Sequence, residues 1–253
     1  MSDSIKEQAA TAAARTATFA AALGGNGDRP KVSPERIDIA LRDGQRGIAN
    51  LHAELVRGLY VYDTTEKQVL IFNGVHYVVD ENEDFFDSLE TIKAVFDDEY
   101  VKRKERAQVD EDKSLKQLQR VIKQLGGKKF SEEILRIAVK GSNRLAVWGS
   151  VWDRCSGFLP VANGKVCLET GRLLPGKPAD FIRTVAPFVY DPDAKCPHFR
   201  EYLLASLDDD KEKLGFVQRF LGYSVRGVPD MGKFLLLFGP HGHNGKTTLF
   251  TGG

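Results

Sequence analysis

One segment carries most of the structural information in this sequence: Phe234-Leu-Leu-Leu-Phe-Gly-Pro-His-Gly-His-Asn-Gly-Lys-Thr-Thr-Leu-Phe250. Its first five residues are apolar and match a short strand that is buried on both faces. A loop with three glycines follows, and Lys246-Thr247 then opens a predicted helix. A strand, a glycine-rich loop, Gly-Lys-Thr and a helix in this order predict a phosphate-binding loop.

The residue types of this loop suit the phosphates of a nucleotide. Glycines let backbone N–H groups approach phosphate oxygens, and the first turn of the following helix adds unpaired N–H donors. We expect Lys246 to be the catalytic residue that contacts the β- and γ-phosphates, and the Thr247 hydroxyl to be a Mg²⁺ ligand. The expected cofactors are ATP and Mg²⁺, and the predicted nucleotide-binding residues are Gly239, Gly242, Asn244, Gly245, Lys246, Thr247 and Thr248.

The loop departs from the simple spacing by one residue. The first glycine of the pattern G-x-x-x-x-G-K-T would fall at Pro240, whereas Gly239 lies one residue earlier. The loop therefore either contains an extra residue or uses Gly242 as its main hinge. The alternative is a glycine-rich turn that precedes Lys-Thr by chance, and the apolar run before it favours the nucleotide interpretation.

Only Leu249 to Gly253 follow the loop in this sequence. A phosphate-loop ATPase also needs an acidic residue on a second strand to hold Mg²⁺, and a cation to meet the transition-state charge. Neither follows the loop here, so we expect residues 233–253 to be the first strand and phosphate-binding loop of an incomplete α/β ATPase core. Whether the chain alone is an enzyme stays open.

The charge of the chain is balanced overall but uneven along it. The formal net charge is +1, which gives no overall attraction to nucleic acid. Residues 80–100 contain nine acids and one lysine, whereas residues 101–140 contain twelve Lys or Arg against six acids. The second block is a candidate for contact with a phosphate backbone, and the alternative is a solvated basic face. The candidate nucleic-acid contacts are Lys102, Arg103, Lys104, Arg106, Lys128 and Lys129.

The composition also bears on the compartment. Cys155, Cys167 and Cys196 are odd in number and lack zinc-ligand spacing, which is typical of free thiols in a reducing compartment. No apolar run approaches membrane-spanning length, and charged residues interrupt the alanine-rich start. We therefore expect a cytoplasmic protein without membrane contact.

The periodicity of the apolar residues predicts an α+β chain with small antiparallel hairpin sheets and helical subdomains. Residues 1–37 are expected to be an Ala-rich arm and linker, and residues 38–155 a mixed hairpin and helical domain. Residues 156–232 are expected to form a second hairpin and helical domain that precedes the incomplete core.

Local signals place the elements of the two domains. Asn73-Gly74 predicts a tight hairpin between strands at 68–72 and 75–79, and Gly126-Gly127 ends a helix that starts near Leu115. Ser131 is expected to open the next helix. Other predicted helix starts and turns are Ser33-Pro34, Asn163-Gly164, Pro197 and Asp208–Asp210.

Four segments then follow one another in the order found in a known family. They are Asn163–Gly171, Tyr190–Pro197, the helix end Leu221–Tyr223 and Phe238–Thr247. This order resembles the region just before and into the ATPase core of phage- and plasmid-type primase-helicases of helicase superfamily 3, and poxviral primase-helicases are similar. Asn244 before Gly-Lys is a feature of that family's loop. The resemblance covers residues 156–250 well and 38–155 loosely, and this loop differs in its extra residue and in His241 and His243.

The resemblance implies an ATP-driven hexameric ring that translocates on single-stranded DNA and unwinds forked DNA in DNA replication, often fused to a primase. The family's magnesium-site acid, polar sensor and arginine finger would lie beyond Gly253, and the finger would come from a neighbouring subunit. Two alternatives stay open: a non-catalytic DNA-binding or oligomerisation module with a remnant loop, and half of a split ATPase completed by another chain.

Overall fold

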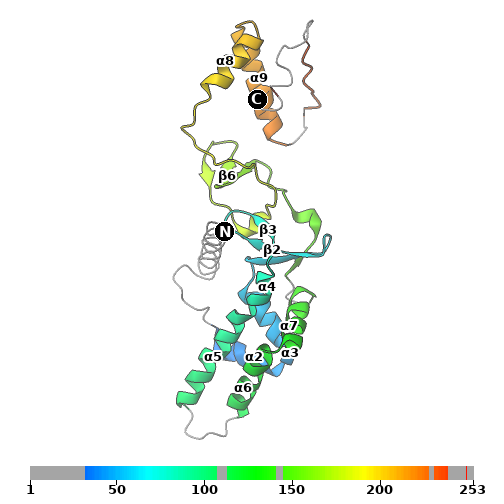
Figure 1. Cartoon of the computed structure of the whole chain (residues 1–253), viewed down its shortest axis with the longest axis vertical. Helices are drawn as coiled ribbons and strands as arrows, with labels where there is room; N and C mark the ends of the chain where they lie inside the picture. The colour runs from blue at the N-terminus through cyan, green and yellow to red at the C-terminus, as the bar shows by residue number, and fades with distance from the viewer. Residues whose placement is uncertain (1–31, 107–112, 141–144, 228–230, 239–248, 250–253) are drawn as a thin grey trace, which may run out of the picture. The chain divides into compact units, whose positions relative to one another are not determined.

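The computed structural model describes residues 32–106, 113–140, 145–227, 231–238 and 249. The described residues divide into two units, and Figure 1 labels many of their elements. Unit 1 contains the described residues up to Arg154 and the segment Gly176–Thr184; unit 2 contains Cys155–Pro175 and the described residues from Val185 onward. Both units combine helices with antiparallel strands, so the predicted α+β class is confirmed.

Unit 1 packs a group of helices beside a small sheet (Figure 1). Its helices are α2 (Pro34–Arg42), α3 (Gly44–Leu55), α4 (Asp84–Asp87), α5 (Leu89–Arg106), α6 (Lys113–Leu125) and α7 (Lys128–Lys140). Its strands are β1 (Tyr60–Asp63), β2 (Gln68–Phe72), β3 (Tyr77–Val79) and β4 (Ala146–Val147). The apolar core lies among the helices and includes Ile48, Ile92, Phe96, Leu118 and Ile134, all of them fully buried.

The first two helices of unit 1 show why the chain turns where it does. Ser33 caps α2 as predicted, because its hydroxyl accepts the N–H of Arg36 at 3.4 Å. Gly47 lies where α3 crosses α2. A Cβ added at Gly47 would overlap the Ala40 carbonyl oxygen and lie 2.9 Å from the Ala40 Cα, so only glycine permits this close approach.

The turn between α6 and α7 differs from the prediction in one respect. α6 ends at Leu125, directly before Gly126-Gly127, as predicted. The prediction that Ser131 opens the next helix is wrong, since α7 already begins at Lys128. The buried Ser131 hydroxyl instead donates to the Leu125 carbonyl at 2.7 Å. Ser131 therefore fixes the end of α6 against α7.

The four strands of unit 1 pair in the order β3-β2-β1-β4, and only β4, which is parallel to β1, departs from antiparallel pairing. The predicted hairpin of β2 and β3 is confirmed, but its loop contains the four residues 73–76 rather than a tight pair. The reason is the Asn73 side chain, whose Oδ1 accepts the N–H groups of Val75 and His76 at 3.0 and 2.9 Å. Such a side-chain turn replaces the backbone turn that Asn-Gly favours.

Unit 2 contains the strands β5 (Phe158–Val161), β6 (Gly164–Cys167) and β7 (Leu173–Leu174), in antiparallel order, and the helices α8 (Pro197–Ser206) and α9 (Lys211–Val225). The predicted turn at Asn163-Gly164 and helix start at Pro197 are confirmed. Asp210 caps α9 by accepting two backbone N–H groups at 3.0 Å. None of the described helices in either unit has the length and apolarity needed to cross a lipid bilayer.

The strand predicted over residues 234–238 is not formed. The described residues 231–238 contain no strand, and Phe234, Leu236 and Phe238 are 84, 77 and 86% exposed. A strand persists only where a neighbouring strand completes its hydrogen bonds, and within the described part of the chain none lies beside this segment. The apolar composition alone therefore predicted the wrong local structure.

Candidate functional site

The predicted phosphate-binding loop lies outside the described residues, because Gly239 to Thr248 all fall in the range 239–248. The nucleotide-binding roles of these residues and the Mg²⁺-ligand role of Thr247 therefore stay predictions. Among the residues that the structure does describe, no three His, Cys, Asp or Glu side chains gather to hold a metal ion.

The candidate nucleic-acid contacts at the end of α5 fall into two groups. Lys102, Lys104 and Arg106 are exposed. Arg103 is mostly buried, and its guanidinium donates to Glu99 at 2.7 Å and to Asp38 at 2.8 Å. Burial lowers the pKa of Arg103, but its bonds to Asp38 and Glu99 outweigh this, so the pKa is raised. Arg103 therefore joins α5 to α2 and is not available to a phosphate.

The candidates at the start of α7 lie on a helix that also carries acids. Lys128 is 3.7 Å from Glu132, one turn along the helix. Arg136 forms a second such pair with Glu133, at 2.7 Å. Lys129 is exposed beside them. Carboxylates of the same helix thus offset much of the positive charge of α7.

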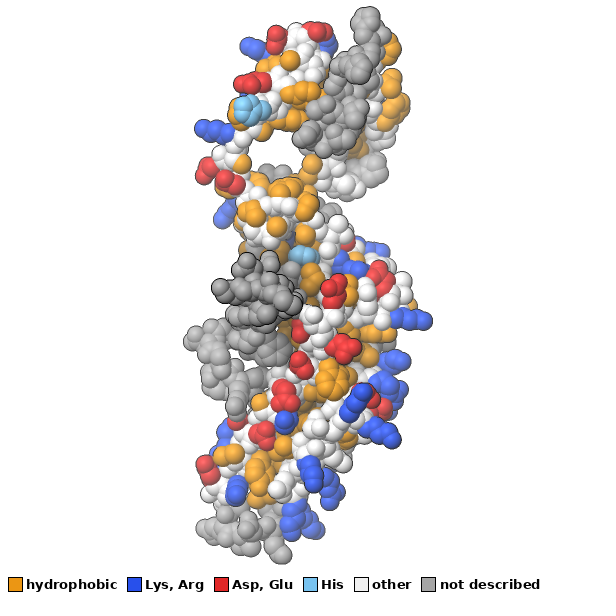
Figure 2. Space-filling view, viewed as in Figure 1, with side chains coloured by type: hydrophobic (Ala, Val, Ile, Leu, Met, Phe, Trp, Pro, Cys, Tyr) orange, Lys and Arg blue, Asp and Glu red, His pale blue; other side chains and the backbone are white. Residues whose placement is uncertain are grey.

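The helix between these two blocks carries cations that the charge count did not single out. Lys113, Lys116, Arg120 and Lys123 are all exposed, and α6 contains no acid. Figure 2 shows Lys and Arg side chains gathered along the part of unit 1 that holds α6 and α7. The signal was present in the sequence as the spacing of three, four and three residues between these cations, which keeps them on one helix face.

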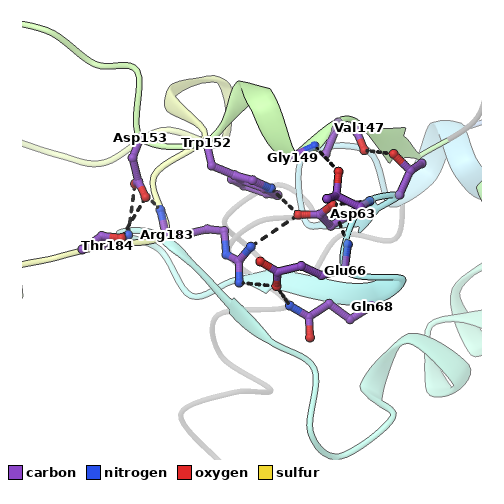
Figure 3. Close-up of polar contacts among 11 residues, drawn as sticks. Asp63, Glu66, Gln68, Val147, Gly149, Trp152, Asp153, Arg183 and Thr184 are labelled. Atoms are coloured by element: carbon purple, nitrogen blue, oxygen red, sulfur yellow. Dashed lines mark hydrogen bonds and ion pairs between the residues drawn. The ribbon is translucent and has the colours of Figure 1, made fainter.

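A network of hydrogen bonds surrounds Asp63, the last residue of β1 (Figure 3). The Asp63 carboxylate is fully buried and accepts the N–H groups of Thr65 and Glu66 at 2.7 and 3.2 Å. It also accepts the indole N–H of Trp152 at 2.6 Å and the guanidinium of Arg183 at 3.3 Å. Burial raises the pKa of Asp63, but the four donors together lower it below its usual value of 3.8.

A second carboxylate completes what we call the polar junction, formed by Asp63, Glu66, Trp152, Asp153, Arg183 and Thr184 (Figure 3). Asp153 accepts the backbone N–H groups of Arg183 and Thr184 at 2.8 and 3.0 Å, and the Thr184 hydroxyl at 2.8 Å. Arg183 also donates to Glu66 at 2.9 Å. The two aspartates are thus bound by donors of the chain itself. The polar junction holds the segment 176–184 on unit 1 and presents no free reactive carboxylate from Asp63.

Comparisons with known proteins give one match. The family model described as D5 N terminal like matches residues 52–205, a range that begins in α3, ends in α8 and covers more than half of the chain. No curated protein and no solved structure matches the chain. The predicted relationship to phage and plasmid primase-helicases is confirmed for this N-terminal region, including residues that the resemblance covered only loosely. The chain belongs to the D5 N terminal like family, the N-terminal domain of D5-like primase-helicases of phages and plasmids.

Proposed function

We propose that this chain is the N-terminal portion of an ATP-dependent DNA helicase of superfamily 3 that acts in DNA replication. One observation carries the proposal. The region that matches the D5 N terminal like family, residues 52–205, is followed in the same chain by the segment Gly239-Pro-His-Gly-His-Asn-Gly-Lys-Thr247. A replication domain of this family and a nucleotide-phosphate motif in this order support an ATP-driven motor on DNA.

The residues of the loop have distinct roles in this proposal. The backbone N–H groups around Gly242 and Gly245 surround the phosphates, and Lys246 neutralises the charge on the β- and γ-phosphates. The Thr247 hydroxyl holds Mg²⁺. Single-stranded or forked DNA is the polymer substrate. Further copies of the intact helicase, of which this chain is the N-terminal portion, complete a ring in which a neighbour supplies the arginine finger.

Nucleotide binding by the full chain tests the proposal. We would titrate a fluorescent ATP analogue into the wild type, Lys246→Ala and Thr247→Ala, with and without Mg²⁺. A charge-assisted contact contributes about 1.5–3 kcal/mol, so Lys246→Ala is expected to weaken binding by about 10- to 100-fold. Thr247→Ala is expected to weaken it only when Mg²⁺ is present, because its contact is to the metal.

The matched control is Lys233→Ala, which removes an exposed lysine that precedes the apolar segment. This variant is expected to bind the analogue like the wild type. The proposal is wrong if the wild type does not bind the analogue, or if Lys246→Ala and Lys233→Ala have the same affinity.

A further inference from the structure

The solvent-facing side of α6 has a charge pattern that differs from every other described helix of unit 1. Lys113, Lys116, Arg120 and Lys123 follow one another at intervals of three, four and three residues. At 3.6 residues per turn they lie within an arc of about 80°. They extend over about 15 Å of helix, since each residue adds 1.5 Å. We call these four side chains the basic stripe.

Among the residues that the structure describes, no carboxylate pairs with the basic stripe. Some other cations of unit 1 pair within their own helix, as Lys93 does with Glu90 and Arg136 with Glu133. In the described part of the chain, no ion pair involves any of the four side chains of the stripe. The helix itself has no Asp or Glu. Within the described part of the chain, four adjacent positive charges are therefore available to an external anion.

The opposite face of α6 fixes the stripe in place. Leu115, Leu118, Val121 and Leu125 are buried there. The Gln117 side chain donates to the Leu41 carbonyl at 2.9 Å, which joins α6 to α2. Binding at the stripe would need no ordering of the backbone, and only the ends of four long side chains would lose freedom.

The composition of the exposed face selects the kind of anion. It carries Lys, Arg and Gln but no aromatic residue, so bases cannot stack on it as they do in sequence-tolerant single-strand grooves. It also lacks the apolar and aromatic centre of a protein–protein interface, in which Lys is depleted. A polymer of phosphates meets both conditions, because over about 15 Å a DNA duplex presents about nine negative charges.

We propose that the basic stripe of α6 binds the phosphate backbone of DNA without reading its sequence. The inference rests on the proposed function for the choice of DNA as the polymer. It adds to that function the surface of the N-terminal domain that holds the DNA. Phosphate contacts position a protein on DNA and carry no base information. The stripe therefore supplies affinity and leaves sequence choice to other parts of the protein.

The test compares two four-residue variants of the full chain. The stripe variant is Lys113→Gln, Lys116→Gln, Arg120→Gln and Lys123→Gln. The control variant is Lys67→Gln, Lys195→Gln, Arg200→Gln and Lys211→Gln, four exposed cations that also comprise three lysines and one arginine. Both variants have the same net charge, so a difference between them reports the location of the cations. Gln is a good helix former, which preserves α6.

We would measure binding by fluorescence anisotropy with labelled single-stranded and duplex DNA of mixed sequence, from 50 to 200 mM NaCl. Four phosphate contacts contribute about 3.6 to the slope of log K against log salt for a duplex, and about 2.8 for a single strand. The slope of the stripe variant is expected to be smaller than that of the wild type by this amount. Its affinity at 100 mM salt is expected to be at least about 10-fold weaker. The affinity of the control variant is expected to stay within about two-fold of the wild-type value. Homopolymer competitors of different sequence are expected to displace the labelled DNA about equally well.

Three further variants keep the test informative if the stripe variant does not fold. Lys116→Gln and Arg120→Gln alone should each reduce the duplex slope by about 0.9. Lys113→Arg, Lys116→Arg and Lys123→Arg together keep the charge and should keep the slope.

Each contrary outcome has a separate meaning. If the wild type binds DNA and the two four-residue variants bind equally, the stripe is not the surface, and the proposed function is untouched. The same holds if the stripe variant changes only self-association in sedimentation, which would make the stripe a contact between copies. If the wild type binds no DNA at 50 mM salt, the inference is wrong, and the Lys246 nucleotide experiment decides the ATP-binding part of the proposed function independently.

Discussion

The indole N–H of Trp152 and the carboxylate of Asp63 are joined by a hydrogen bond of 2.6 Å, and the carboxylate is fully buried. These residues are 89 positions apart in the sequence. Trp152 also packs edge-on against Tyr77 and Phe181, with ring centroids 5.4 and 5.8 Å away. The bond therefore links β1 to an aromatic cluster and to the segment that Arg183 anchors.

Replacing Asp63 should destabilise unit 1 strongly. Asp63→Ala removes the acceptor of four donors, and the Trp152 N–H would be left without its partner in a partly buried site. We expect the free energy of unfolding to fall by about 3 kcal/mol. Both tryptophans of the chain, Trp148 and Trp152, lie in unit 1, so tryptophan fluorescence during urea unfolding reports this unit.

The control for this prediction is Glu66→Gln, which removes the more exposed carboxylate that Arg183 also contacts. Exposed ion pairs contribute little, so the change is expected to stay below about 1 kcal/mol. Equal losses in the two variants would show that the buried bonds of Asp63 add nothing beyond a surface ion pair.

His52 and Ser88 form a second buried pair, with 2.8 Å between Nε2 and Oγ. The Ser88 hydroxyl donates to the Phe85 carbonyl at 2.6 Å, so the ring must carry its proton on Nε2 and donate it to Ser88. The ring Nδ1 is buried without a hydrogen-bond partner. Burial lowers the pKa of His52 from 6.5 to about 4. The pair is therefore a neutral part of the core, and neither residue is exposed to act on a substrate.

The lowered pKa of His52 makes the stability of unit 1 depend on pH. The unfolded histidine binds a proton near pH 6.5 and the folded one near pH 4, so the stabilisation is complete above pH 6.5 and is lost as the pH falls towards 4. Between pH 7 and pH 5 the free energy of unfolding should fall by about 2 kcal/mol. The lowered pKa of Asp63 acts below its usual value of 3.8, outside this window.

His52→Leu isolates this contribution. Leucine removes the unpaired Nδ1, and Ser88 keeps its bond to the Phe85 carbonyl. The variant should be about as stable as the wild type at pH 7. Between pH 7 and pH 5 its free energy of unfolding should fall much less than that of the wild type. His76→Asn is the comparison, because the pKa of His76 is also lowered by burial, although this side chain is only half-buried. A fall at pH 5 that persists in His52→Leu would rule out His52 as its source.

Local rules of the sequence were sufficient for many element boundaries. Ser33, Gly126-Gly127 and Asp210 end or begin helices because caps and glycines act within one turn of the chain. The basic stripe was equally local and was missed for a different reason. A count of charges over residues 101–140 does not show which helix carries the acids. α6 has none, whereas Glu132 and Glu133 pair with Lys128 and Arg136 in α7.

Features that join distant residues did not follow from the sequence. The parallel pairing of β4 with β1 brings Ala146 beside Tyr62, and the ion pair of Arg183 with Asp63 spans 120 positions. Nothing in the local pattern of either partner specifies the other. The apolar run at 234–238 failed as a strand for the same reason, since a strand depends on neighbours that its own composition does not name.

Substituting Gly47 should test the close packing of α2 and α3. Gly47→Ala places a Cβ against the Ala40 backbone, which cannot move aside as a flexible side chain would. We expect a loss of about 2 kcal/mol or more in the unfolding of unit 1, measured by tryptophan fluorescence. The matched glycine is Gly222, also inside a helix, where an added Cβ meets nothing within 4 Å. Gly222→Ala should stabilise α9 by up to about 1 kcal/mol, measured by circular dichroism. A neutral Gly47→Ala would contradict the packing of α2 on α3.

The apolar segment at 234–238 should make the chain self-associate. Phe234 and Phe238 are 84 and 86% exposed, whereas Leu235 and Leu237 between them are half-buried. Exposed apolar area without a partner favours association, and two ring side chains contribute most of it here. Phe234→Ser with Phe238→Ser is therefore expected to lower both the binding of a hydrophobic dye and the sedimentation-measured association. Leu235→Ser with Leu237→Ser removes the same number of apolar side chains and should lower both less. If the leucine pair has the larger effect, the face that drives association is the half-buried one, and the exposed rings are not its cause.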